Sequence, residues 1–388
     1  METILTALLL LFGATEASGG SPTLDDWARA AEAARQAAVH AQTGSSGVPM
    51  VEKIDPQPDA PTVRGVYATA HSAGGARLEK LLRLVDETEL NALVIDVKDD
   101  HGYVTYPTAD PAIQARDTTK TIIKDPAALL KKLQEHETYP IARIVVFKDS
   151  VLAAKRPDLS FVQSDGAVWK NGRGESFVNP YRKEVWEYNV QVAKEAAALG
   201  FQEIQFDYVR FPEGFEKKAD VLQYHRDERE RIDVVADFVK YAREQLEPLG
   251  VRVSVDIFGY AASVPAAEGI GQDFVKISEF VDVICPMVYP SHYSTGWFGS
   301  KVPDAAPYVT IDGAMKDTHE KLEPLGEFKP IVRPWIQDFT ATWVQGHIRY
   351  GKAEVEAQIR ALKDNGIDEF LLWNAGNTYT SGVDYDLE

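Results

Sequence analysis

The 388-residue sequence predicts an α/β protein, folded as a (β/α)8 TIM barrel with enlarged βα loops. The first observation is that eight apolar runs of strand length follow residue 63. The second is that helical segments with apolar residues at spacings of three and four separate many of these runs. The third is that Gly200, Gly250 and Gly366 each lie between a helical segment and a strand, where helices commonly end in glycine.

The expected elements alternate along the chain. Eight units of a strand followed by a helix, over roughly 320 residues, favour a barrel over a doubly wound sheet. A doubly wound sheet would carry a glycine-rich phosphate loop after its first strand, and Gly74-Gly75 lacks that spacing, so no nucleotide site is predicted. The expected strands cover residues 64–70, 92–99, 141–149, 203–210, 252–260, 281–289, 332–339 and 369–374, and the helices include 76–90, 126–136, 180–199, 227–249 and 353–364.

The expected barrel covers residues 62–388, and a separate segment precedes it. An apolar run at residues 4–12, followed by small residues, predicts a signal peptide or anchor over residues 1–18. The protein is therefore expected to be exported to the periplasm, the cell envelope or the extracellular space. The run is too short to span a bilayer comfortably, so no integral membrane domain is expected beyond it. Residues 19–61 are expected to form an Ala-rich helix and then a linker rich in Gly, Ser and Pro.

The composition excludes several classes of function. A formal net charge of -18 argues against a nucleic-acid partner, because such binding depends on Lys and Arg that neutralise phosphates. The 8 histidines are scattered, and no His, Asp and Glu cluster has the spacing of metal ligands, so neither a metal nor another cofactor is expected. The single cysteine, Cys285, lies in an apolar run and is expected to be a core residue. No feature of the sequence indicates an oligomeric state.

Charged residues end two neighbouring strands of the expected barrel. The run at residues 203–210 has the apolar pattern of a buried strand, yet it ends in Asp207 and Arg210. Asp256 ends the next strand in the same way. Active sites of TIM barrels lie at these strand ends, because the following loops converge there. If the strand faces that carry Asp207 and Asp256 point into the barrel, the two carboxylates meet near its axis.

A pair of carboxylates can cleave a glycosidic bond. One attacks the sugar or activates water, while the other donates a proton to the leaving oxygen. We expect Asp207 to be the nucleophile, kept ionised by Arg210 or Lys98, and Asp256 to be the acid/base. The structural alternative is that such an aspartate only caps a helix or pairs with an arginine. Weaker candidates for the acid are Asp96, Asp149 and Asp338.

Other side chains near the same strand ends are expected to bind the sugar. Alternation along the strand puts Asp96 and Lys98 on one face. The alternatives are that Lys98 only neutralises a neighbouring carboxylate, that Trp297 packs within its own loop, and that Trp373 belongs to the barrel core. The candidates for substrate binding are Asp96, Lys98, Tyr208, Arg210, Tyr260, Tyr289, Trp297, Gln337, Trp373 and Asn374.

Three motifs of the expected strands occur together: Arg64-Gly-Val-Tyr67 on the first strand, Leu93-Val-Ile-Asp96-Val-Lys98-Asp99-Asp100 on the second, and Phe206-Asp207-Tyr-Val-Arg210-Phe-Pro212 on the fourth. In combination they resemble the DUF4015 family of bacterial TIM barrels over roughly residues 62–380. The resemblance implies a (β/α)8 barrel of the glycosidase type, carbohydrate hydrolysis, and Asp207 at the strand-four position where related retaining α-glycosidases carry their nucleophile. Many such enzymes have Glu after strand five, where this chain has Asp256.

The sequence therefore predicts a glycoside hydrolase that cleaves O-glycosidic bonds of a polysaccharide or cell-surface glycan, with a carbohydrate substrate as its partner. The alternative is a catalytically silent TIM barrel that binds glycans in the cell envelope. The two differ in whether both carboxylates project into one cleft with aromatic walls. In a binding protein, Asp256 would instead be held in a structural ion pair.

Overall fold

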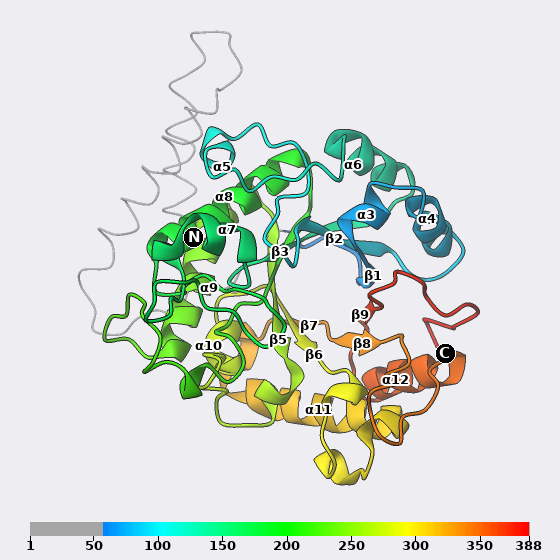
Figure 1. Ribbon diagram of the computed structural model, residues 1–388. Coiled ribbons are helices and arrows are strands. Elements are labelled where there is room, and N and C mark those ends of the chain that lie inside the picture. The colour runs from blue at the N-terminus through cyan, green and yellow to red at the C-terminus, as the bar shows by residue number, and fades with distance from the viewer. Residues whose placement is uncertain (1–56, 388) are drawn as a thin grey trace, which may run out of the picture. The chain divides into compact units, whose positions relative to one another are not determined.

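Parallel strands form a closed barrel in the computed structural model, which describes residues 57–387. Six strands, β1 to β6, pair in chain order, and β9 pairs with β1 to close the ring (Figure 1). The predicted (β/α)8 barrel is thus confirmed. The strands are β1 (Arg64–Ala68), β2 (Ala92–Lys98), β3 (Tyr139–Val145), β4 (Glu203–Asp207), β5 (Arg252–Phe258), β6 (Val283–Met287), β7 (Ile331–Val332), β8 (Trp335–Gln337) and β9 (Phe370–Trp373).

Two short strands share one position of the barrel. Both β7 and β8 pair with β6, and β8 also pairs with β9. Pro334 lies between them and has no backbone N–H to donate, which explains the interruption of the ladder. The run expected at residues 332–339 is therefore one broken strand.

Helices surround the strands on the outside of the barrel (Figure 1). Helix α8 ends at Gly200, whose φ of +114° lies in the left-handed region, as the sequence predicts for a helix C-terminal glycine. No helix within residues 57–387 combines the length and apolar character needed to cross a bilayer. The longer helices are α4 (Leu78–Asp86), α6 (Pro126–Glu135), α8 (Lys183–Leu199), α9 (Arg231–Leu246), α11 (Pro307–Leu322) and α12 (Lys352–Asp364).

The expected segments before the barrel lie outside the described residues. They are the signal peptide or anchor at residues 1–18 and all of the helix and linker up to residue 56. Both remain predictions.

The interior of the barrel combines an apolar cluster with buried charges. Cys285 lies fully buried in this cluster, which confirms its prediction as a core residue. At the amino end of the strands, the guanidinium of Arg333 binds both carboxylate oxygens of Glu203, at 2.7 and 2.9 Å, and also Glu369. The polar residues at the opposite end of the strands form the candidate site.

A bulge in β2 corrects one prediction about that end. The register between β2 and β3 shifts between Asp96 and Lys98, so Asp96 lies opposite Arg143 while Lys98 lies opposite Ile144. One extra residue turns the following side chain to the other face of a strand. The expectation that Asp96 and Lys98 share a face is therefore wrong.

Candidate active site

A cavity of about 490 Å³ opens at the carboxyl ends of the strands. Asp207, at the end of β4, and Asp256, on β5, both line it. The two carboxylates come together because Gln205 pairs with Ser254 in parallel register, which places the side chains two residues further on the same face. The structure thus brings the predicted pair into one cavity.

Asp207 is held from two sides. The Nε and Nη2 atoms of Arg143 both donate to its Oδ2, at 3.0 and 2.6 Å, and the backbone N–H of Tyr208 donates to its Oδ1 at 2.6 Å. Tyr208 has a φ of +52°, a left-handed conformation that is unfavourable for a non-glycine residue. Such strain is concentrated at functional sites, where the surrounding structure maintains it. The carboxylate is therefore fixed in position before any substrate binds.

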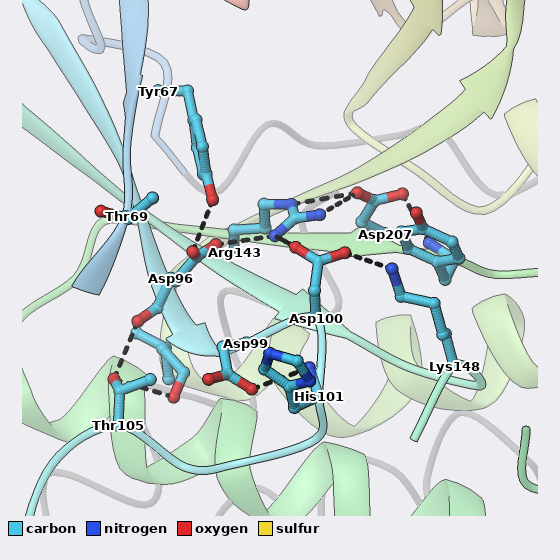
Figure 2. A network of polar contacts seen from close by, with 12 residues as sticks. Tyr67, Thr69, Asp96, Asp99, Asp100, His101, Thr105, Arg143, Lys148 and Asp207 are labelled. Carbon is cyan, nitrogen blue, oxygen red and sulfur yellow. Dashed lines mark hydrogen bonds and ion pairs between the residues drawn. The ribbon is translucent and has the colours of Figure 1, made fainter. Parts of the chain in front are cut away.

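Arg143 connects three carboxylates and was missed by the sequence analysis. Besides Asp207, it binds Asp96 at 2.7 Å and Asp100 at 3.2 Å through Nη1 (Figure 2). Burial alone would lower the pKa of this guanidinium, but the three carboxylates raise it well above its usual value. A signal was present in the sequence, because Arg143 follows Tyr139 and Ile141 in alternation on one face of a buried strand.

Asp96 and Asp100 both accept from Nη1 of Arg143 (Figure 2), but their pKa values shift in opposite directions. Burial raises the pKa of Asp96 to about 6, although Arg143 opposes this shift. The hydroxyl of Tyr67 also donates to Asp96, at 2.6 Å. For Asp100, burial acts in the same direction, but the charges of Arg143 and Lys148 outweigh it and hold the pKa of that carboxyl well below its usual range.

Asp256 has the environment of a proton donor. Its side chain is buried, and its Oδ1 accepts a hydrogen bond of 2.7 Å from Nε1 of Trp335. Burial, and then the negative charge of Asp207, raise the pKa of Asp256 well above its ordinary value. Within the described part of the chain, Asp256 forms no ion pair that would compensate its charge. These surroundings favour the protonated form of the carboxyl.

Aromatic rings form much of the cavity wall. Trp373 stacks on Tyr67, with ring centroids 4.1 Å apart, and Trp335 packs edge-on against Trp373. On another side, Phe258 and Tyr260 stack at 5.6 Å. Apolar rings beside carboxylates match the alternating C–H faces and hydroxyls of a sugar ring.

Arg210 belongs to this wall instead of binding Asp207. Its guanidinium lies over the rings of Tyr208 and Phe258 and pairs with Glu213 at 3.2 Å. The expectation that Arg210 or Lys98 balances the charge of Asp207 is therefore corrected, because Arg143 does so. Of the predicted binding residues, those that line the cavity are Tyr208, Arg210, Tyr260, Tyr289 and Trp373.

Lys98 and Asp149 form a buried ion pair away from the cavity. Their side chains are fully buried, and the two charged atoms lie 2.7 Å apart. Asp149 also accepts a hydrogen bond from the backbone N–H of Leu152 and so caps α7 (Ser150–Lys155). Neither residue lines the cavity. This pair joins the end of β2 to the segment that follows β3, so both side chains are structural.

The remaining predicted residues support the loops around the cavity. Gln337 accepts from the backbone N–H of Ser291 and donates to Asp304, which ties two loops to the end of β8. Asn374 donates to the carbonyl oxygens of Asp338 and Thr378. Trp297 packs edge-on against Tyr293, with centroids 5.4 Å apart, and lies outside the cavity lining. Asp96 lies behind Arg143, and Asp338 is bonded to Thr380.

A metal site is not evident in the described range. No group of three or more His, Cys, Asp or Glu side chains within residues 57–387 is arranged to hold a metal ion.

Comparisons with known proteins identify the family of this chain. Residues 65–379 match the model of the DUF4015 family, which is described as a "putative glycosyl hydrolase domain". A hypothetical protein from Ruminiclostridium thermocellum ATCC 27405 is 36% identical, with 49% of this chain and 96% of that chain covered and a TM-score of 0.45. Among proteins with curated descriptions, no sequence match was found.

Two solved glycosidase structures share the fold at low sequence identity. The glycoside hydrolase domain of PgaB (BpsB) from Bordetella bronchiseptica has a TM-score of 0.55 at 14% identity, with 81% of this chain and 94% of that chain covered. An α-galactosidase from Thermus thermophilus, in complex with stachyose, has a TM-score of 0.51 at 13% identity, with 83% and 63% covered. At these identities, the similarity shows the barrel fold alone.

Proposed function

Because this chain belongs to the DUF4015 family of glycosyl hydrolase domains, we propose that it hydrolyses O-glycosidic bonds of a polysaccharide or cell-surface glycan through Asp207 and Asp256. The observation that carries this proposal is that both carboxylates line one cavity and have opposite surroundings. Asp207 is ion-paired with Arg143, whereas Asp256 is buried without a cation. Glycoside hydrolysis requires one ionised and one protonated carboxyl group at the same bond.

In this mechanism, Asp207 acts on the anomeric carbon. Its Oδ2 is occupied by the two N–H groups of Arg143, whereas Oδ1 accepts only the backbone N–H of Tyr208. A carboxylate placed in this way can attack the sugar or orient a water molecule for attack. In either case, its negative charge stabilises the positive charge that develops on the ring in an oxocarbenium-like transition state.

Asp256 supplies the proton. Burial and the charge of Asp207 raise its pKa and so favour the protonated carboxyl, and the hydrogen bond from Trp335 fixes its orientation. As the glycosidic bond breaks, Asp256 transfers this proton to the leaving oxygen. If Asp207 attacks the sugar, the resulting Asp256 carboxylate takes a proton from the water that cleaves the glycosyl intermediate, which restores both groups. If Asp207 instead activates the water, Asp207 takes that proton, and proton exchange with solvent restores both groups.

The surroundings of Asp256 also favour an enzyme over the alternative of a silent glycan-binding barrel. A silent barrel has no use for an uncompensated buried carboxyl, because an unpaired charge there costs stability. Such a group would be expected in a structural ion pair, as Lys98 and Asp149 are. Arg143, which also lines the cavity, instead binds Asp207, Asp96 and Asp100.

The proposal includes export of the protein. It rests on the apolar run at residues 4–12, which is typical of a signal peptide. A fusion of residues 1–61 to a reporter tests it, and retention of the reporter in the cytoplasm would contradict export.

A hydrolysis screen tests the activity. The full chain is incubated with a panel of polysaccharides, beside Asp207→Asn and Asp256→Asn, and released sugars are identified by mass. Asp338→Asn is the matched control, because Asp338 also ends a barrel strand and is buried but does not line the cavity. We expect activity in the wild type and the control, and a loss of at least about 1,000-fold in both site variants. Glycan binding without cleavage would favour the silent barrel.

Aryl glycosides separate the two roles. A phenol of low pKa leaves without protonation, so Asp256→Asn should keep much of its bond-cleavage rate on such a substrate, whereas Asp207→Asn should not. Equal losses for both variants on this substrate would contradict the assignment of Asp256 as the acid.

A further inference from the structure

A series of aromatic rings leads from the cavity to the surface of the barrel end. Tyr289 lines the cavity and contacts Trp373. Phe339 packs edge-on against Tyr289, with centroids 6.0 Å apart. Trp343 in turn stacks on Phe339, again at 6.0 Å and with an angle of 20° between the rings. The series therefore joins the candidate active site to a residue outside it.

Trp343 is unusually exposed for its type. The structure leaves 67% of this side chain accessible, and Trp343 is the only aromatic among the large apolar side chains exposed within residues 57–387. Single exposed apolar residues are normal on protein surfaces. Trp343 differs from these because it stacks on Phe339, and Phe339 in turn contacts Tyr289 in the cavity wall. Its exposure contributes little to the core and calls for another explanation.

The segment that presents Trp343 is held in place. It lies between β8 and α12, in the orange part of the chain (Figure 1). The carbonyl oxygen of Phe339 accepts from Gln337, and Tyr350 donates its backbone N–H to the hydroxyl of Thr340. Within the segment, Val344 N–H bonds to the carbonyl of Ala341 at 3.0 Å. The exposed ring is thus a fixed platform, so binding to it costs little conformational entropy.

We propose that Trp343, supported by Phe339, is an outlying sugar-binding subsite for a polymeric glycan whose cleaved bond lies at Asp207 and Asp256. This inference rests on the proposed hydrolase function and names its substrate class. Rigid aromatic faces bind the C–H faces of pyranose rings, and an exposed tryptophan does so at low entropic cost. A monosaccharide or disaccharide in the cavity would not need this ring, whereas a longer chain leaving the cavity past Tyr289 would reach it.

Affinity electrophoresis tests the subsite without requiring catalysis. Full-length Asp207→Asn protein is run in gels that contain glycol chitin, carboxymethyl cellulose, xylan, laminarin, dextran or soluble starch. We expect at least one polymer to retard it, Trp343→Ala in this background to weaken that retardation about fivefold or more, and Trp343→Phe to restore most of it. Val221→Ala is the matched control, because Val221 is equally exposed, at 67%, and does not line the cavity. Retardation unchanged by Trp343→Ala, or no retardation by any polymer, would overturn the subsite.

Kinetics distinguish failure of the subsite from failure of the hydrolase proposal. In the active enzyme, Trp343→Ala should lower kcat/KM for a cleaved polymer about tenfold more than for a short aryl glycoside. Equal effects on both substrates would count against the subsite but leave the hydrolase intact. If nothing is cleaved while gel retardation still depends on Trp343, the hydrolase proposal fails and the glycan subsite stands. Circular dichroism and Tm confirm that the variants remain folded.

Discussion

Replacement of Arg143 by Met removes the cation on which three carboxylates depend. The side chain of Arg143 is 1% exposed and makes four hydrogen bonds, two to Asp207 and one each to Asp96 and Asp100. Met has a similar length and fills much of the same volume, so the change removes charge more than packing. The carboxylates of Asp96 and Asp207 would remain buried without their cation.

The size of the effect follows from the burial of this network. Removal of one partner from a buried ion pair costs about 3–5 kcal/mol. For a barrel of this size, this corresponds to a fall in Tm of roughly 5–10 °C. Arg333→Met is the matched control, because Arg333 is equally buried in the barrel but pairs with Glu203 and Glu369 at the other end of the strands. Both variants should lose similar stability.

The pH dependence of the loss identifies its cause. Because the pKa of Asp96 in the folded protein, about 6, lies above that of an unfolded chain, charging this group costs stability as the pH rises through that range. Without Arg143 the pKa rises further and the cost grows. The loss of Tm in Arg143→Met should therefore be greater at pH 8 than at pH 5.

The assays are thermal unfolding at both pH values and hydrolysis below the transition. Arg143→Met should lower kcat about 100-fold, because Asp207 loses the two bonds that fix its position. Arg333→Met should leave kcat unchanged, because Arg333 does not line the cavity. A loss in Tm of under about 2 °C, or an equal loss at pH 5 and pH 8, would refute the assignment of Arg143 as the shared cation.

Lys98→Met should destabilise the folded protein by about 3–5 kcal/mol, since it leaves Asp149 buried and unpaired, while kcat/KM of the folded fraction stays that of the wild type. A fall in kcat/KM without a fall in stability would indicate that Lys98 acts in the active site. With an alkyl glycoside, kcat/KM should fall as the pH rises past the raised pKa of Asp256, because only the protonated carboxyl can donate. With an aryl glycoside whose leaving group is an acidic phenol, kcat/KM should not fall over this pH range. If kcat/KM still falls, Asp256 is excluded as the proton donor. Gly259→Ala would place a Cβ atom 2.5 Å from the hydroxyl of Tyr293 and 2.6 Å from a backbone oxygen in the cavity wall. We expect the free energy of unfolding to fall by about 1–3 kcal/mol and KM to rise. An unchanged Tm would show that the neighbouring atoms move to accommodate the methyl group.

Local patterns were sufficient to predict the architecture and the position of Asp207 and Asp256 at one end of the strands. Buried parallel strands are near-continuous apolar runs, and a charge inside such a run, such as Asp207, is conspicuous because burying it is costly. Alternation then placed Asp207 on one face with Gln205, and Asp256 on one face with Ser254, and the structure shows that both carboxylates line the cavity. Each of these inferences uses residues close together in the chain, and the closed barrel confirms the architecture.

The sequence by itself therefore determined the (β/α)8 barrel and brought Asp207 and Asp256 to one end of it, because both follow from short-range periodicity. Only the tertiary structure decided which cation serves which carboxylate. Arg143 reaches Asp207 across 64 positions of the chain, while the bulge in β2 turns Lys98 away from Asp96. Composition and spacing do not reveal such a bulge, and ion pairing inside a barrel depends on distances through space that the pleat, register and closure of the sheet set together.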